Sequence, residues 1–549
     1  MPNPSTDATN FADAAPARSV RWLGLFALFA FAFVSFFTLG PGTIVDPFHQ
    51  GEFFATLPGM LHGQASEHAF TIHGALDFLP AWAATYLSGL NNNFLYTQVA
   101  YALCNLGAAL LFYLIASLFV QRSGKYELLT LIAVAVVSSQ LVGYRDLCLL
   151  LSIYLFLLCL RANRSSDFFI RATLLGVAAA FNMFWSYDRG ITGFGAVGLG
   201  VFLASFYDRR FIYAMVIFIG TFLVLSLMTE VFSLSDYLRN FDFLLSTSSQ
   251  WTYHSPRFII QSALLTIPTV LAYYALFKAL PKPFRFSPAF AVIGLLAVLM
   301  LVLYKVATNR ADFIHVPMGM WAPLLSFLFS YDQLRKAGRK QEFVLLKKPV
   351  AMIVVGAMLL LGLIGKNPMP FFAVLLGLVL IGNNRKPLGY MALIALSGLL
   401  AAFTLYKSPV PNVLANGYKW LPHMASPPQN DLLVSEGARW AASQIKESGS
   451  QCVFDLSNNG IINGVTGLPA CTKYIYPVYA TRVYEQDMIS DLKKSDPSVV
   501  VYSTTFWSFN INDISMHDKF PELKKYLDEK YPYEKCESEY CLRFKNTQG

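Results

Sequence analysis

Apolar runs of about 20 residues recur along most of this chain, and short basic loops separate many of them. A helix needs a stretch of that length to cross the ~30 Å hydrocarbon core of a bilayer. Of the 549 residues, 55% are hydrophobic and only 14% are charged, against about 25% charged in an ordinary soluble domain. We therefore predict a polytopic α-helical membrane protein rather than a series of soluble domains.

The apolar runs predict about thirteen transmembrane helices. The first run, Trp22 to Leu39, follows two arginines, a start that also suits a cleaved signal peptide. Its length and the poor cleavage sequence at 39–42 favour an uncleaved helix. The other runs lie at about 94–120, 127–142, 147–160, 172–186, 191–206, 211–231, 258–280, 287–304, 317–331, 349–365, 370–382 and 388–406.

The distribution of Lys and Arg predicts how these spans are oriented. Positive charge concentrates in the cytoplasmic loops of membrane proteins, and most basic residues here fall in one alternate set of loops. The first loop on the opposite side, residues 41–93, contains no Lys or Arg. We expect a multi-pass protein of the bacterial inner membrane with a cytoplasmic N-terminus and a periplasmic C-terminal segment. The net charge of +9 follows from this orientation and does not indicate a nucleic-acid partner.

The composition becomes that of a soluble domain from about residue 408. We divide the chain into a transmembrane domain, 1–407, with its first outer loop at 41–93, and a periplasmic domain, 408–549. Helical patterns at 431–447, 485–494 and 520–531 alternate with strand patterns at 452–456 and 499–502, which predicts a small α/β domain. The Asn- and Gly-rich stretch 456–464 follows the first strand, which is a usual position for a ligand site. An ordinary turn-rich connection is an equal alternative.

Four of the seven cysteines lie in this C-terminal segment. An even number of cysteines in an oxidising compartment favours disulfides. Cys536 and Cys541 are close enough in sequence to close a hairpin, and Cys452 with Cys471 is the remaining pair.

The first outer loop opens with an acidic cluster that contains Asp46, His49 and Glu52. Such a group is costly at a membrane boundary unless it is used. A carboxylate here can take the proton of a hydroxyl nucleophile as a general base. Asp46 and Glu52 can alternatively bind a divalent cation, Mg²⁺ or Mn²⁺, through oxygen. The plain structural reading is that the Asp46-Pro47 pair turns the chain out of the membrane.

Charged residues at the outer ends of the spans form a second group. Arg is suited to a phosphate oxyanion through its forked donors, so we predict that Arg145, Arg189 and Arg310 bind a donor phosphate. The alternative is that each Arg pairs only with its neighbouring Asp, or extends to the interface. The long loop at 232–257 is expected to close over a sugar. The predicted substrate-binding residues are His73, Asp77, Asp188, Asp312, His315, Tyr253 and His254.

This arrangement resembles the GT-C superfamily of membrane glycosyltransferases, which have a long acidic first outer loop, many spans and an outer C-terminal domain. The resemblance implies transfer of a sugar from a polyprenyl-phosphate donor to a glycan, lipid or protein acceptor, with inversion at the anomeric carbon. It implies Asp46 as the base, followed by Glu52. The adjacent acidic pair usual in that superfamily is replaced here by Asp-Pro-x-His-x-Gly-Glu at 46–52. An arabinofuranosyltransferase, which uses a decaprenyl-phosphate pentose, is one subgroup that fits.

Two other functions are open to a chain of this kind. An O-antigen ligase or polymerase centres its chemistry on a large late loop, whereas the acidic cluster here comes first. A lipid or polysaccharide transporter tends to carry polar residues at mid-membrane, whereas the charges here cluster at the outer ends of the spans. The sequence therefore favours a glycosyltransferase that works among membrane lipids.

Overall fold

A computed structural model describes residues 18–37, 40–48, 50–62, 70–89, 92–119, 141–228, 233–248, 253–279, 287–311, 315–336, 410–457, 459–503 and 516–546, with isolated positions between 131 and 138. The predicted spans at 349–365, 370–382 and 388–406, and most of the span at 127–142, lie outside the described residues. The predicted domain boundary at 407–408 lies outside them as well.

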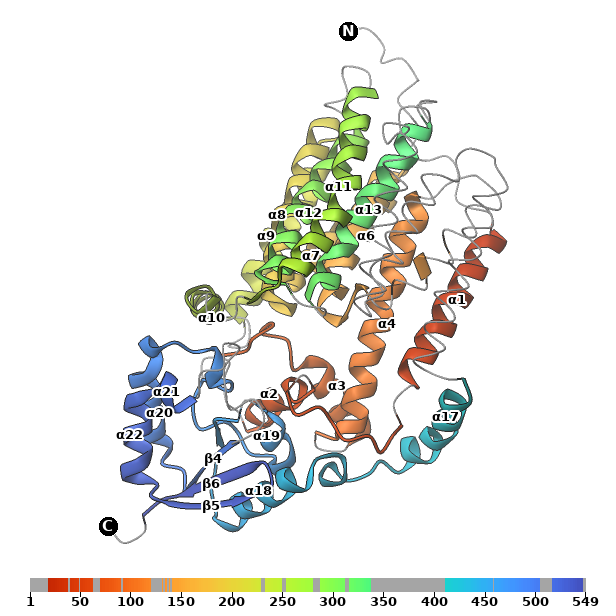
Figure 1. The fold of residues 1–549 in the computed structure, drawn as a ribbon. Coiled ribbons are helices and arrows are strands. Elements are labelled where there is room, and N and C mark those ends of the chain that lie inside the picture. The colour runs from red at the N-terminus through yellow and green to blue at the C-terminus, as the bar shows by residue number, and fades with distance from the viewer. Residues whose placement is uncertain are drawn as a thin grey trace.

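The long helices form one bundle, which occupies the upper part of Figure 1. They are α1 (Arg18–Phe36), α4 (Phe94–Phe119), α6 (Leu147–Leu160), α7 (Ser165–Trp185), α8 (Tyr187–Tyr207), α9 (Phe211–Met228), α11 (Pro256–Ala279), α12 (Pro288–Asn309) and α13 (His315–Lys336). Each corresponds to a predicted span. Among the described residues, α4, α7, α8 and α12 are long and apolar enough to cross a membrane. The chain is thus a helical membrane protein with several apolar spans, while the count of thirteen stays a prediction.

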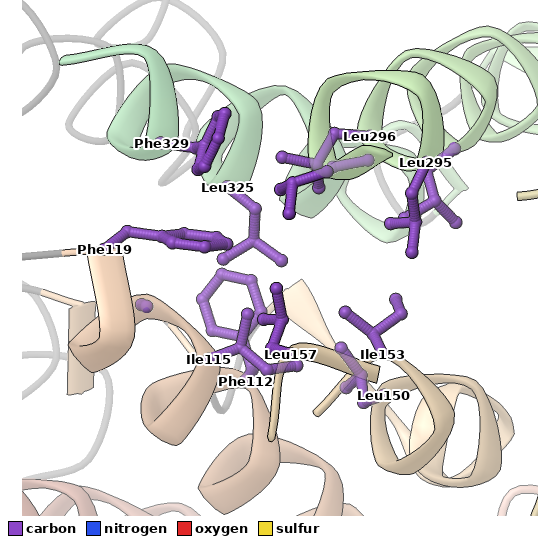
Figure 2. Packing of buried hydrophobic residues seen from close by; sticks show 14 of the residues in the cluster. Phe112, Ile115, Phe119, Leu150, Ile153, Leu157, Leu295, Leu296, Leu325 and Phe329 are labelled. Carbon is purple, nitrogen blue, oxygen red and sulfur yellow. The ribbon is translucent and has the colours of Figure 1, made fainter. Parts of the chain in front are cut away.

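Large apolar side chains fill the centre of the bundle. Figure 2 shows Phe119 of α4 and Ile153 of α6 on one side and Leu296 of α12 and Phe329 of α13 on the other. All four are buried, and the rings of Phe119 and Phe329 lie 5.2 Å apart. Because lipid tails are as apolar as these side chains, close van der Waals packing of this kind holds the helices together.

Short helices lie between the bundle and the C-terminal sheet (Figure 1). They are α2 (Glu52–Leu61) and α3 (Leu79–Ser88) in the first outer loop, and α10 (Leu234–Thr247). The stretch 232–257, expected as a loop, is therefore largely helical, and the Ser233 side chain accepts a hydrogen bond from the Asp236 N–H at its start. Ser is a favoured helix cap for this reason. A fourth helix, α17 (Val410–Ala425), lies against α1, where the Trp420 and Phe36 rings are 4.9 Å apart.

The C-terminal region contains a mixed four-stranded sheet with the order β3-β4-β6-β5. Its strands are β3 (Phe454–Asp455), β4 (Val499–Ser503), β5 (Tyr533–Glu537) and β6 (Tyr540–Phe544). Strand β3 runs parallel to β4, and β6 runs antiparallel to both β4 and β5. The helices are α18 (Glu436–Glu447), α19 (Ile461–Thr466), α20 (Glu485–Ser495), α21 (Met516–Lys519) and α22 (Pro521–Lys530), with 3-10 turns at Asn430–Leu433, Pro477–Tyr479 and Arg482–Tyr484. The predicted alternation of helices and strands is confirmed, and α19, α21, β5 and β6 are additions to it.

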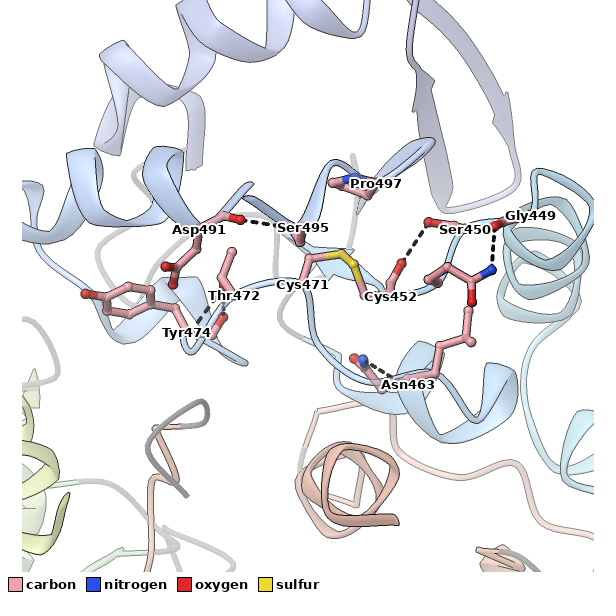
Figure 3. The surroundings of a disulfide bond; sticks show 12 residues. Gly449, Ser450, Cys452, Asn463, Cys471, Thr472, Tyr474, Asp491, Ser495 and Pro497 are labelled. Carbon is pink, nitrogen blue, oxygen red and sulfur yellow. Dashed lines mark hydrogen bonds between the residues drawn. A yellow bond between two sulfur atoms is a disulfide. The ribbon is translucent and has the colours of Figure 1, made fainter. Parts of the chain in front are cut away.

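Both predicted disulfides are present, Cys452–Cys471 and Cys536–Cys541. The second closes the β5–β6 hairpin, because Cys536 lies directly opposite Cys541 in the strand register. The first joins the residues just before β3 to the segment that leads to Tyr474 (Figure 3). It therefore ties together the two ends of the loop that contains the Asn- and Gly-rich stretch.

Candidate active site

The second half of the first outer loop is fixed to the junction between α7 and α8. The Leu76 N–H donates to the Phe184 carbonyl (3.0 Å), and the Tyr187 N–H donates to the His73 carbonyl (2.7 Å). A Cβ at Gly74 would lie 2.3 Å from the Trp185 carbonyl oxygen, so the two backbones approach as closely as they do because residue 74 is a glycine. This docking places the neighbouring side chains over the start of α8.

Glu52 and His73 form a partly buried acid–imidazole pair. Glu52 is the first residue of α2, where the helix dipole favours a negative charge. Its Oε2 lies 2.8 Å from His73 Nε2. The Tyr479 hydroxyl, from the C-terminal region, donates to Glu52 Oε1 at 3.5 Å. A carboxylate from α2 and an imidazole from the docked segment thus meet in one place.

Asp77 is a buried carboxyl beside this pair. The Tyr144 hydroxyl donates to its Oδ1 at 3.2 Å. Burial raises the pKa of Asp77 to about 6, with His73 and Arg145 opposing the rise and Glu52 adding to it. The Tyr144 hydroxyl thus links Asp77 to the segment that carries Arg145.

Two arginines and two aspartates cross-link the outer ends of α6 and α8. Arg145 Nη2 lies 2.7 Å from Asp188 Oδ2. Arg189 lies 3.0 Å from the same oxygen through Nη1, and its Nε lies 2.5 Å from Asp146 Oδ1. The alternative expected from the sequence was that each Arg pairs only with its neighbouring Asp. This holds for Arg189 with Asp188, but the network also joins Arg145 to Asp188 and Arg189 to Asp146. Arg189 is 2% exposed whereas Arg145 is 21% exposed. The Arg145 Nε is buried and has no hydrogen-bond partner among the described residues, so Arg145 has donor capacity to offer a ligand.

Asp46 shapes the start of the first outer loop. Its Oδ1 accepts a hydrogen bond from the Phe48 N–H at 2.9 Å, and its carbonyl accepts from the Gly51 N–H at 3.1 Å. An Asp that bonds the backbone two residues on is a turn former, as the plain structural reading of Asp46-Pro47 expects. The residue is exposed. Its role as the base stays a prediction.

Two outer segments that carry other predicted residues come together through their backbones. Strand β1 (Tyr253–His254) pairs in parallel with β2 (Arg310–Ala311), so that Tyr253 lies opposite Arg310. The predicted residues His49 and Asp312 lie outside the described residues.

The start of α13 adjoins the arginine–aspartate network. His315 is the first residue of this helix, and the Met318 carbonyl accepts a hydrogen bond from Arg189 Nη2 at 3.4 Å. The start of α13 therefore lies at the same end of the bundle as Arg189.

Two tyrosines of the site, Tyr144 and Tyr479, were not among the residues predicted from the sequence. Tyr144 contacts Asp77, and Tyr479 contacts Glu52. Tyr144 directly precedes the predicted Arg145-Asp146 pair, which is a signal that was available. Tyr479 belongs to a tyrosine-rich run at 474–479, but 427 residues separate it from Glu52, so its position follows only from the tertiary fold.

No family model matches the chain, and no curated protein matches it. Among solved structures, ArnT from Cupriavidus metallidurans in the apo state aligns with a TM-score of 0.47 and 14% identity over 96% of this chain and 98% of that one. The same protein bound to undecaprenyl phosphate gives 0.46 and 14% over the same shares. The Archaeoglobus fulgidus oligosaccharyltransferase in its apo form gives 0.42 and 10%, over 87% of this chain and 69% of that one.

This chain is similar in its overall arrangement to these two proteins. At these TM-scores the likeness concerns the overall arrangement and identifies no residue of the site.

Proposed function

We propose that this chain is a membrane glycosyltransferase that moves a sugar from a polyprenyl-phosphate donor to an acceptor hydroxyl at the outer face of the membrane. One observation carries the proposal: the Glu52–His73 pair meets at 2.8 Å, and Tyr144, the neighbour of Arg145, contacts the buried carboxyl of Asp77. These residues lie at the ends of apolar helices, where the phosphate of a lipid-linked sugar would lie. A proton acceptor beside a phosphate-binding cation is what this transfer requires.

Glu52 is the base in this proposal. The acceptor hydroxyl gives its proton to the Glu52 carboxylate as its oxygen attacks the anomeric carbon, and the bond to the donor phosphate breaks with inversion. His73 and Tyr479 hold the carboxylate in position. Asp46, the base that the GT-C resemblance implies, is the alternative.

Arg145 binds the donor phosphate in this proposal, because its Nε has no partner in the described part of the chain and its side chain is partly exposed. Arg189 supports it through their shared partner Asp188. Arg310, in β2, is a further proposed ligand of the donor phosphate. We place the site in the periplasm, with a glycan, lipid or protein as acceptor and a pentose such as arabinofuranose as one candidate sugar.

A divalent cation between Asp46 and Glu52 is a further proposal. The two Glu52 oxygens contact His73 and Tyr479. Within the described ranges, no set of three His, Cys, Asp or Glu ligand atoms gathers around Glu52. A cation there would need ligands from water or substrate, as Mg²⁺ commonly has, and would then polarise the donor phosphate.

Binding of undecaprenyl phosphate to the purified protein tests the donor site without turnover. Charge-assisted hydrogen bonds to phosphate are worth roughly 1.5–3 kcal/mol, so Arg145→Ala should weaken binding about 10- to 100-fold. Arg439→Ala, an exposed arginine of α18 that pairs with Glu436, is the matched control and should bind as the wild type does. Equal binding by Arg145→Ala and the wild type would show that Arg145 does not hold the phosphate.

A further inference from the structure

Three buried side chains of the C-terminal region have polar atoms without a partner, close to its contact with α2. They are Asp455, Asn459 and Tyr476, which are 4%, 1% and 5% exposed. Asp455 Oδ2, Asn459 Oδ1 and the Tyr476 hydroxyl have no hydrogen-bond partner among the described residues. Leaving a polar group buried and unpaired destabilises a protein, and each such group calls for an explanation. Three at one place point to a ligand.

The three side chains lie together. Asp455 is the last residue of β3, and Asn459 follows it by four residues in the loop toward α19. A Cβ at Gly460 would lie only 2.1 Å from the Tyr476 hydroxyl oxygen, so this hydroxyl sits directly against the chain after Asn459. The Asp455 charge also acts on Tyr476. We call Asp455, Asn459 and Tyr476 the interface subsite.

The interface subsite adjoins the Glu52–His73 pair. The same Cβ at Gly460 would lie 2.8 Å from the Gly51 carbonyl oxygen and 2.8 Å from the Ala55 side chain. Gly51 directly precedes Glu52, and Ala55 follows it by three residues on α2. The Glu52 charge, like that of Asp455, acts on the Tyr476 hydroxyl. The subsite therefore reaches the proposed base from the side of the C-terminal region.

The disulfide Cys452–Cys471 holds the interface subsite together. Cys452 precedes β3, which ends at Asp455, and Cys471 begins the segment that leads through Tyr474 to Tyr476. Figure 3 shows the bond joining these two segments directly. The bond thus restrains the segment of Tyr476 against the segment of Asp455.

The hydrogen-bonding groups of the interface subsite indicate which class of ligand would bind there. A carboxylate oxygen and an amide oxygen accept hydrogen bonds, and a phenol both donates and accepts. The set contains no cationic side chain, so it suits neutral hydroxyl groups better than a phosphate. Building on the proposed function, we infer that the interface subsite binds hydroxyl groups of a carbohydrate acceptor beside Glu52. A divalent cation is the competing ligand for such oxygen atoms, and the experiment separates the two.

Tyr476→Phe removes only the unpaired hydroxyl. We expect thermal stability to be unchanged or higher, because an unpaired buried group is lost. The matched control is Tyr531→Phe, whose buried hydroxyl donates to the Pro497 carbonyl at 3.0 Å. This control should lower stability and leave ligand binding unchanged. Loss of stability in Tyr476→Phe together with unchanged ligand binding would mean that its hydroxyl has a structural partner, which overturns the inference.

Ligand binding is measured without any donor, so that it does not depend on turnover. The probes are methyl glycosides of hexoses and pentoses. Their binding to the full-length protein in detergent is measured by saturation-transfer NMR. We expect binding to the wild type and to Tyr531→Phe, and at least a tenfold loss in Tyr476→Phe. The inference stands on this result even if no polyprenyl-phosphate sugar supports transfer, in which case the proposed function alone fails. Absence of glycoside binding to the wild type overturns it. A second outcome also overturns the inference: Mg²⁺ or Mn²⁺ stabilises the wild type, and Asp455→Asn abolishes this stabilisation without affecting glycoside binding.

Discussion

The imidazole Nε2 of His73 lies 2.8 Å from the Glu52 carboxylate. Helix α2 presents the carboxylate, and the docking of the loop on the α7–α8 junction presents the imidazole. The pair therefore depends on two separate contacts of the first outer loop, one with the C-terminal region and one with the bundle. Each contact can be disturbed on its own.

Gly74→Ala should disturb the contact with the bundle. The new Cβ would lie 2.3 Å from the Trp185 carbonyl oxygen, so the loop must shift and carry His73 and Asp77 with it. We expect a stability loss of about 1–3 kcal/mol and a fall in transfer activity of more than tenfold. Gly198→Ala is the control, because a Cβ at this position of α8 meets nothing within 4 Å. Full activity of Gly74→Ala would show that the docking does not position the site.

Arg189 should matter more for stability than Arg145 does. Removing Arg189 leaves the buried Asp146 without its cation, and breaking a buried ion pair typically costs about 3–5 kcal/mol. Thermal unfolding of Arg189→Ala in detergent should show this loss. Arg210→Ala removes a more exposed pair with Asp208 and should change stability by less than about 1 kcal/mol. An Arg189→Ala protein as stable as the wild type would contradict the assignment of Arg189 as a structural cross-link.

Asp77 should make stability depend on pH. Its pKa is raised from 3.8 to about 6 in the folded chain, so the folded state binds more protons than the unfolded state between those values. Stability from this group is present below pH ~4 and is lost as the pH rises through ~6. Asp77→Asn should flatten this fall, measured as unfolding temperature at pH 4.5 and pH 7. Because burial also raises the pKa of Asp455 to about 6, Asp455→Asn should flatten it separately. An unchanged pH dependence in Asp77→Asn would contradict the burial of a titrating carboxyl.

The two disulfides should differ in their effect on activity. The Cys452–Cys471 bond spans 19 residues, so replacing both cysteines with Ser should cost roughly 3 kcal/mol and reduce activity through Asp455 and Tyr476. Replacing Cys536 and Cys541, which are 5 residues apart and close the β5–β6 hairpin, should leave activity intact. Mapping of non-reduced peptides checks the bonds themselves. Four free thiols would contradict both the pairing and the proposed periplasmic location.

Those parts of the fold that depend on local pattern were predictable from the sequence. Apolar runs located the described long helices, because a helix in lipid must be apolar over its whole length. The disulfides followed from four cysteines in one outer segment. Helix α10 was missed because apolar and polar residues are mixed along it, as at Leu238 and Arg239. It is therefore much less apolar than the neighbouring spans and was interpreted as a loop.

The sequence predicted several residues of the candidate site but not how they contact one another. Glu52, His73, Asp77 and Arg145 were all identified as candidates, but the sequence put Asp46 first because it directly follows the first span. The contact between Glu52 and Tyr479 joins residues 427 positions apart, and no local pattern encodes such a contact. The turn geometry of Asp46, by contrast, is local and was anticipated.

The most direct test of this account is the rate at which purified Glu52→Gln transfers a labelled sugar from a polyprenyl-phosphate donor, measured beside Asp46→Asn and the wild type. A general base contributes about 10²–10⁴-fold, so Glu52→Gln should lose activity by that factor while unfolding at the wild-type temperature and binding undecaprenyl phosphate normally. Extra Mg²⁺ or Mn²⁺ should not restore it. Asp46→Asn should remain active. An active Glu52→Gln together with an inactive, well-folded Asp46→Asn would show that the base is Asp46 and that Glu52 only supports the loop.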